Sequence, residues 1–180
     1  AVRAFTLWDG FFRWRAYRPA MPEKEVRDIP RPLREQYEKA VAAIQRNNLD
    51  YAITILGDVA QREPAFYAGR EALRAAQLKK AGTSRGFLRK VFGTAGSSPL
   101  LAKGQIELRT NPLDALRTAE QILNSDPHNL HAHRLLAEAA LASDLPRTAV
   151  LSLELVFKGA PDRDVALKFL FGGGADTNQK

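Results

Sequence analysis

The feature that most constrains the fold of this chain is a stretch bounded by Pro127 and Pro161, which lie 34 residues apart. Two amphipathic helical patterns fill it, separated by a break at residues 143–146, Ser-Asp-Leu-Pro. Each pattern carries a small residue, Ala137 or Ala149, where two helices of a hairpin must approach closely. The stretch therefore predicts a hairpin of two antiparallel helices.

Further helical patterns precede and follow this hairpin. We expect Asp50 to cap the N-terminus of one helix, Gly82 to cap the C-terminus of another, and Gly104 to give close approach in a third. Pro64 and Pro99 end repeats as Pro127 and Pro161 do. The additional predicted helices span residues 33–48, 50–64, 66–81, 100–109, 113–125 and 164–171.

The joint pattern of spaced prolines, small residues and paired helices over residues 33–171 resembles the tetratricopeptide (TPR) repeat family. Ala40, Ala52 and Val59 match its packing positions, whereas Gln36 stands where the family has tryptophan, and Phe87 where it has alanine. The resemblance implies an all-α, right-handed superhelical solenoid of antiparallel hairpins, with about three and a half to four repeats and a concave groove.

Three regions follow from these patterns. Residues 1–32 form an aromatic and basic arm with a proline-rich linker, because four prolines between residues 19 and 32 prevent one continuous helix. Residues 33–171 form the TPR-like repeat domain, with an irregular glycine-containing insertion at 82–98. Residues 172–180 form a polar tail.

Composition narrows the function classes. The 180 residues include no cysteine, which excludes disulfides, thiolate metal sites and cysteine catalysis. No apolar run reaches the roughly 20 residues of a transmembrane helix. The net charge of +7 favours acidic partners, whether protein, nucleic acid or anionic lipid. The sequence leaves the compartment open, with the cytoplasm as the expected one.

The arm and the insertion both interleave aromatic with basic side chains. The arm could cap the exposed end of the first hairpin, dock on a partner protein, or contact lipid or nucleic acid. The insertion could bind a partner or complete the core of a distorted hairpin. The residues concerned are Trp8, Phe11, Phe12, Trp14, Arg15 and Tyr17 in the arm, and Arg85, Phe87, Arg89 and Lys90 in the insertion.

The resemblance also places a groove along the first helix of each hairpin. This mixed surface suits a peptide or a helix. Its predicted residues are Arg34, Tyr37, Val41, Ile44, His131, Arg134, Glu138 and Leu141.

No arrangement of residues predicts catalysis, a cofactor or a metal. His131 and His133 are two residues apart on a helix and point about 200° apart around it, which is poor geometry for a metal. The glycine-rich residues 93–98 lack the lysine and preceding strand of a phosphate loop. Carboxylates are dispersed, and pairs such as Arg117 with Glu120 suit a solvated helix face.

We therefore expect a non-catalytic TPR scaffold that mediates protein–protein interaction or complex assembly through its groove and arm. Its partner would be a peptide, a helix or a neighbouring subunit, and self-association is compatible with the same surfaces. The alternatives are a helical-repeat protein that binds nucleic acid, peripheral contact with a membrane, and an enzyme with an unrecognised site.

Overall fold

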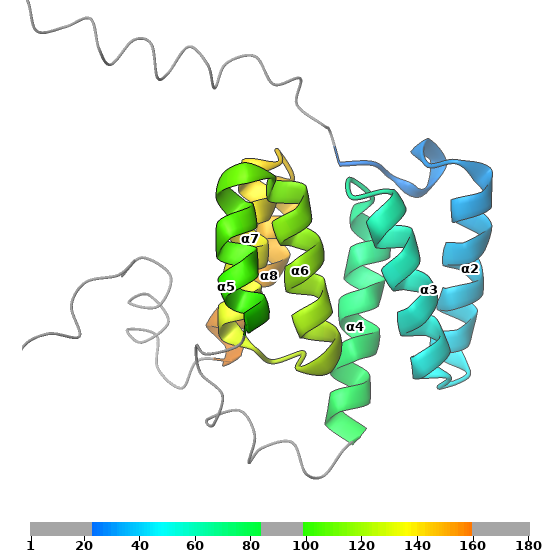
Figure 1. Ribbon diagram of the computed structural model, residues 1–180. Helices are drawn as coiled ribbons and strands as arrows, with labels where there is room; N and C mark the ends of the chain where they lie inside the picture. Colours follow the sequence, from blue (N-terminus) through cyan, green and yellow to red (C-terminus); the bar gives the residue numbers. More distant parts are fainter. Residues whose placement is uncertain (1–22, 84–98, 160–180) are drawn as a thin grey trace, which may run out of the picture.

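The computed structural model describes residues 23–83 and 99–159, and the predictions for residues 1–22, 84–98 and 160–180 lie outside it. The described chain is all-α, with consecutive helices packed against each other (Figure 1), as the sequence predicts. A short 3₁₀ helix, Val26–Asp28, precedes seven α-helices: α2 (Arg31–Gln45), α3 (Leu49–Arg62), α4 (Tyr67–Thr83), α5 (Pro99–Thr110), α6 (Pro112–Ser125), α7 (Leu130–Ala142) and α8 (Pro146–Gly159).

Two hairpins, α2–α3 and α7–α8, turn in the same way. Asn47 and Asp144 take the left-handed backbone conformation, with φ of 60° and 58°. In both turns the next residue donates its N–H to the carbonyl oxygen four positions before the left-handed residue, at 2.9 Å. Asparagine and aspartate tolerate this conformation better than other side chains, so they replace the glycine that usually ends a helix this way.

The same hairpins also repeat in their packing. Asn47 and Asp144 are 97 residues apart, and so are Pro64 and Pro161. Small residues with this offset are buried where the paired helices approach. They are Ala40 and Ala52 in the first hairpin and Ala137 and Ala149 in the last. The small residues predicted for helix packing are therefore buried in both hairpins, and the fold is compatible with a helical repeat.

Three helix ends differ from their predicted positions. Asp50 lies in the first turn of α3, and Asn48 occupies the N-cap position, so the predicted cap is wrong by two residues. Gly82 lies inside α4, which continues to Thr83, and does not end the helix. Residues 23–32 are more than a linker, because α2 begins at Arg31, directly after Pro30. Pro32 lies in the first turn of α2, where a proline is tolerated because the N–H groups of that turn have no partner within the helix.

The buried hydrophobic residues of the described helices form two clusters in the first half and one in the second. Ala65, in the turn between α3 and α4, is the one residue of the described first half that joins the core of the second. The first half buries side chains that include Leu33, Leu56, Phe66 and Leu73. The second half, α5–α8, buries Leu116, Leu123, Leu135 and Leu136, among others. Burying these leucines stabilises each half by about 2 kcal/mol per side chain.

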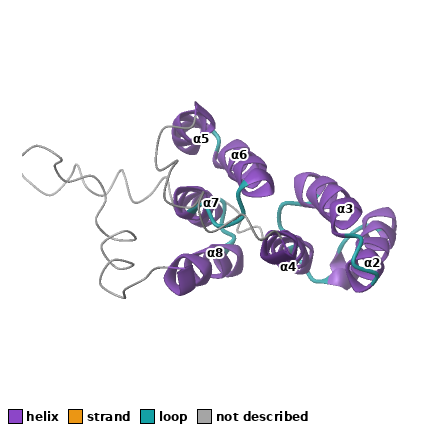
Figure 2. Ribbon diagram, turned by 90° about the horizontal axis from the view of Figure 1, so that it is seen from below, coloured by secondary structure: helices purple, strands orange, loops and turns teal. Residues whose placement is uncertain are grey.

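The two halves meet where α4 packs against α8 and α3 against α6 (Figure 2), and where Arg70 of α4 bonds to Glu120 of α6. The segment before α2 closes one end of this junction. Glu23 caps the N-terminus of α8, accepting hydrogen bonds from the backbone N–H of Arg147 (2.8 Å) and Thr148 (2.7 Å) and from the Thr148 hydroxyl (2.8 Å). A carboxylate is favoured there because it satisfies free N–H groups and complements the positive end of the helix dipole.

The neighbouring residues join this closure to the first half. The backbone N–H of Lys24 donates to the carbonyl oxygen of Ala65 at 2.8 Å. Arg147 pairs with Glu25 at 2.6 Å, and its guanidinium lies 4.0 Å from the ring centroid of Tyr67 at the start of α4. Residues 23–25 therefore contact the α3–α4 turn and α8 at once.

None of the described helices is long and apolar enough to cross a membrane.

Two mid-helix glycines test the close packing of α5. A Cβ atom on Gly104 would lie 2.4 Å from Cδ2 of the buried Leu135, whereas one on Gly57 would meet nothing within 4 Å. We expect Gly104→Ala to lower the free energy of unfolding by about 1 to 3 kcal/mol through overpacking. Gly57→Ala should raise it by about 0.5 to 1 kcal/mol through helix propensity. Urea denaturation measures both, and stabilisation by both changes would contradict the close approach.

Candidate functional site

A polar hollow of about 360 Å³ lies on the surface between α5 and α7. Gly104 and Leu101 hold α5 against α7, because both are buried in the interface between these helices. Two of the side chains around the hollow are apolar and four are polar. They are Leu101, Ala102 and Gln105 from α5, and His131, Arg134 and Glu138 from α7.

Three of the predicted groove residues line this hollow together. His131, Arg134 and Glu138 recur at intervals of three and four residues, which places them on one face of α7. Arg134 Nε donates to Glu138 Oε1 at 2.9 Å. Partial burial and the nearby Arg134 guanidinium lower the pKa of His131, so its ring is neutral at pH 7. Leu141, 55% exposed, continues the same face.

The other four predicted groove residues lie on α2, at the far end of the molecule. Tyr37 packs edge-on against Phe66, with ring centroids 5.1 Å apart, and its pKa is raised by burial and by Glu71. Arg34 donates to the carbonyl oxygens of Val26, Arg27 and Ile29 and so fixes the 3₁₀ helix. Val41 and Ile44 are half-buried. Helices α3 and α4 lie between α2 and α7 (Figures 1 and 2), so the two sets of predicted groove residues lie apart.

The remaining predicted contact residues lie outside the described ranges. These are the arm residues Trp8, Phe11, Phe12, Trp14, Arg15 and Tyr17, and the insertion residues Arg85, Phe87, Arg89 and Lys90. Residues 93–98 and the predicted helix at 164–171 lie outside them as well.

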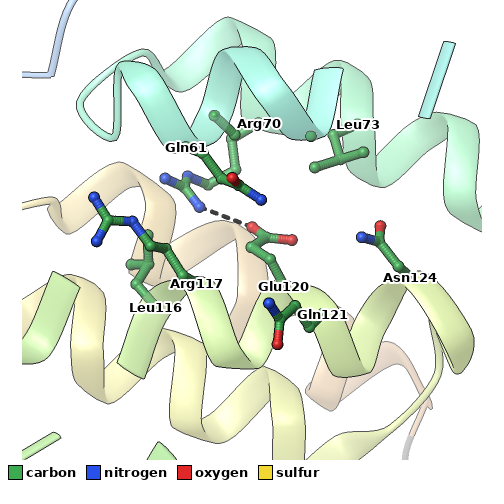
Figure 3. Close-up of a pocket in the computed structure, with 10 residues that line it drawn as sticks. Gln61, Arg70, Leu73, Leu116, Arg117, Glu120, Gln121 and Asn124 are labelled. Atoms are coloured by element: carbon green, nitrogen blue, oxygen red, sulfur yellow. Dashed lines mark hydrogen bonds and ion pairs between the residues drawn. The ribbon is translucent and has the colours of Figure 1, made fainter. Parts of the chain in front are cut away.

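A buried charge network crosses the junction between the two halves, and Figure 3 shows its bond between Arg70 and Glu120. Arg70 and Arg74 lie one turn apart on α4, and both donate to Glu120 on α6, Arg70 to Oε1 and Arg74 to Oε2, each at 2.8 Å. The arginines are 1% and 2% exposed and the glutamate 8%. The two guanidinium groups lower the pKa of Glu120 against the opposing effect of burial, so the carboxylate stays ionised.

Further polar groups complete the network. Arg70 also donates to the carbonyl oxygen of Pro64 at 3.0 Å, and Arg74 bonds to Gln77. Gln77 in turn donates to Asn124 on α6 at 2.6 Å. The adjoining cavity has a volume of about 20 Å³, which is room for about one water molecule. The network therefore joins helices and leaves no room for a substrate.

The predicted pair of Arg117 with Glu120 is wrong. Arg117 is exposed and pairs with Asp114 at 2.5 Å, whereas Glu120 points to α4. Sequence reasoning missed Arg70 and Arg74 because arginines on an alanine-rich helix look like a solvated face. The spacing of the two arginines was the available signal. Arg70 and Arg74 are four residues apart, so they lie on one face of α4, together with the buried Leu73 and Gln77.

His133 lies on the opposite side of α7 from the hollow and is 1% exposed. Its Nε2 lies 2.9 Å from the carbonyl oxygen of Pro127, so Nε2 carries the proton and donates. Burial and the nearby Arg74 lower its pKa to about 4. The structure thus separates His131 from His133, and no group of three metal-binding side chains comes together within the described residues.

No protein-family model, curated protein or solved structure matches this chain. The TPR resemblance therefore stays a prediction, and function is argued from the geometry.

Removal of Glu120 tests the network. Glu120→Ala leaves two buried guanidinium groups without a counterion, so we expect it to lower the free energy of unfolding by about 3 to 5 kcal/mol at pH 7. Glu138→Ala, which breaks the more exposed pair with Arg134, is the matched control and should cost about 1 kcal/mol or less. Urea denaturation followed by circular dichroism measures both, and equal losses would contradict the network's role.

The buried histidine predicts a loss of stability in acid. The folded pKa of His133 lies below the unfolded value, so the unfolded chain binds the proton first as the pH falls from about 6.5 to about 4. The free energy of unfolding of the native protein therefore falls by about 2 to 3 kcal/mol between pH 7.5 and 4.5 through this histidine alone. In His133→Gln the fall over the same pH range should be smaller by that amount. The pKa of Glu120 is also lowered, so protonation of Glu120 destabilises both proteins in acid. The difference between the two losses of unfolding free energy therefore reports the histidine alone.

Urea denaturation at the two pH values makes the measurement, with His131→Gln as the control because His131 is much more exposed than His133. The same acid loss in the native protein and in His133→Gln would contradict a buried, neutral His133.

Proposed function

We propose that this protein is a non-catalytic, TPR-like scaffold that holds a segment of a partner protein in the hollow between α5 and α7. The observation that carries the proposal is the face of α7 described above, where three predicted groove residues gather around about 360 Å³ of open space. The 97-residue repetition between the first and last hairpins supports the repeat resemblance. We also propose that the helix hairpins follow a right-handed superhelix, as in the TPR family.

The composition of the hollow suits a short peptide or one turn of a helix. Leu101 and Ala102 offer apolar contact, while Gln105 and the Arg134–Glu138 pair offer donors and acceptors along the same wall. Peptide grooves combine these two elements, since apolar contact gives affinity and fixed polar groups give register. Because solvent reaches the Arg134–Glu138 pair, the pair is weak, and either side chain can give up its partner for a bound segment at little cost in free energy.

The alternatives find less support in the described residues. An enzyme with paired carboxylates needs one whose pKa is raised for proton transfer, and Glu120, the buried glutamate at the junction, has a lowered pKa and two arginine partners. A nucleic-acid surface needs basic side chains turned to solvent in one track. At the hollow, Arg134 pairs with Glu138, and on α5 Lys103 pairs with Glu107, which offsets the charge of both basic side chains.

Charge reversal at the hollow tests the proposal. Arg134→Glu places a second acid beside Glu138 and should reduce capture of the partner from native extract at least tenfold, measured by quantitative mass spectrometry. The matched control is Arg62→Glu, because Arg62 forms the same kind of pair with Asp58 on α3, at 3.0 Å against 2.9 Å. The control should capture the partner as the native protein does.

Loss of capture with both variants, or with neither, would contradict a binding site at the hollow. Recovery of nucleic acid in place of protein, with affinity that falls steeply as salt rises, would favour the nucleic-acid alternative.

A further inference from the structure

Residues 23–25 form a strap that crosses the end of the molecule where α4 and α8 begin (Figure 1). The strap is extended, and its middle residue, Lys24, forms an isolated parallel bridge with Phe66. Successive side chains of an extended chain point to opposite sides. Accordingly, Lys24 pairs with Glu63 of the first half at 2.8 Å, whereas the glutamates on either side of it both contact α8.

The strap completes the N-terminus of α8. The residue before this helix is Leu145, whose side chain has no oxygen to accept hydrogen bonds from the first N–H groups of the helix. Glu23, which precedes Arg147 by 124 residues, takes that role with its carboxylate. The end of α8 is therefore capped only when the strap lies on it.

The contacts of the strap are polar and open to solvent. None of its three residues is buried, and the side chains that form the pair of Arg147 with Glu25 are 50% and 52% exposed. Exposed ion pairs hold two elements together weakly and are screened by salt. The strap contributes no side chain to the hydrophobic clusters of the described residues, so apolar burial does not hold it closed.

The contact between α4 and α6 is of the opposite kind. Glu120 and its two arginine partners on α4 are all buried, so their separation would leave charges unpaired away from water. Helix α4 is thus fixed firmly to α6 and linked to α8 by exposed polar contacts near its start. A firm contact and a releasable contact on the same helix allow rotation about the firm one.

We propose that the strap is a releasable catch that sets the angle between the two halves. In the closed state, which is the state of the structure, Glu23 and Glu25 hold α8 beside the start of α4. In the open state the strap leaves α8, and the halves rotate about the buried Glu120 network with their own helices intact. The strap shares no residue with the α5–α7 hollow, so this proposal stands independently of the proposed function.

Distances between spin labels test the proposal, because the native chain has no cysteine to compete for the label. Glu38→Cys on α2 with Val150→Cys on α8 spans the two halves, and Gln121→Cys with Val150→Cys lies within the second half. With the strap intact, double electron–electron resonance should give one narrow distance for each pair. Glu23→Ala with Glu25→Ala should raise the fraction of other distances at least fivefold for the first pair and leave the second pair unchanged.

The matched control also removes two carboxylates from exposed ion pairs, but within the first half. Glu35→Ala breaks the pair with Arg31 on α2, and Asp58→Ala breaks the pair with Arg62 on α3. Neither carboxylate contacts the second half through these pairs. We expect both distance distributions of the control to match those of the native strap.

Two outcomes would overturn the proposal. An unchanged distribution for the first pair would show that the strap does not hold the halves together. Broadening for both pairs would show that loss of the strap disorders α8 and does not release it. Circular dichroism checks that each variant keeps its helix content. If the double variant does not fold, Arg147→Gln removes the pair with Glu25 from the α8 side and takes its place.

Discussion

The arrangement of the two halves depends on one carboxylate held by two guanidinium groups. Glu120 reaches across from α6, and Arg70 and Arg74 on α4 each take one of its oxygens. Burying three charges is expensive, so the network contributes less to net stability than its short distances suggest. Its effect is on specificity: any other placement of α4 on α6 would leave a buried charge unpaired. The polar contact thus fixes a geometry that apolar packing alone would leave loose.

A second polar contact restrains the same junction from its other end. Glu23 caps α8, and Arg147 at the start of α8 contacts both Glu25 and the Tyr67 ring. Helix α4 is therefore held against α6 through its middle and linked to α8 near its start. Because the hydrophobic cores of the two halves share only Ala65 among the described residues, these directional bonds set how the halves sit together. Each core stabilises its own helices.

The hairpins were accessible to sequence reasoning because their signals are local. The alanines at 40, 52, 137 and 149 and the turn residues at 47 and 144 follow a fixed spacing, and the structure buries or turns the chain at each. The junction was not accessible, because Arg70 and Glu120 are 50 residues apart and each looks solvated within its own helix. The separation of the α2 and α7 groove residues could not be read from the sequence for the same reason. The position of α2 relative to α7 depends on where α4 packs, and the packing of α4 depends on the long-range pairing of Arg70 with Glu120.

The chemistry of each contact decides which surfaces remain for binding. At the junction, the charged side chains are buried and paired, and the adjoining cavity holds about one water molecule. The ion pairs Arg134–Glu138 and Lys103–Glu107 on α7 and α5, in contrast, are partly exposed, so they gain little from their mutual attraction and lose little when they rearrange. A surface of such weak pairs beside open apolar side chains can exchange its contacts for those of a partner. The buried network cannot, which is why we place the proposed binding of a partner on the α5–α7 face.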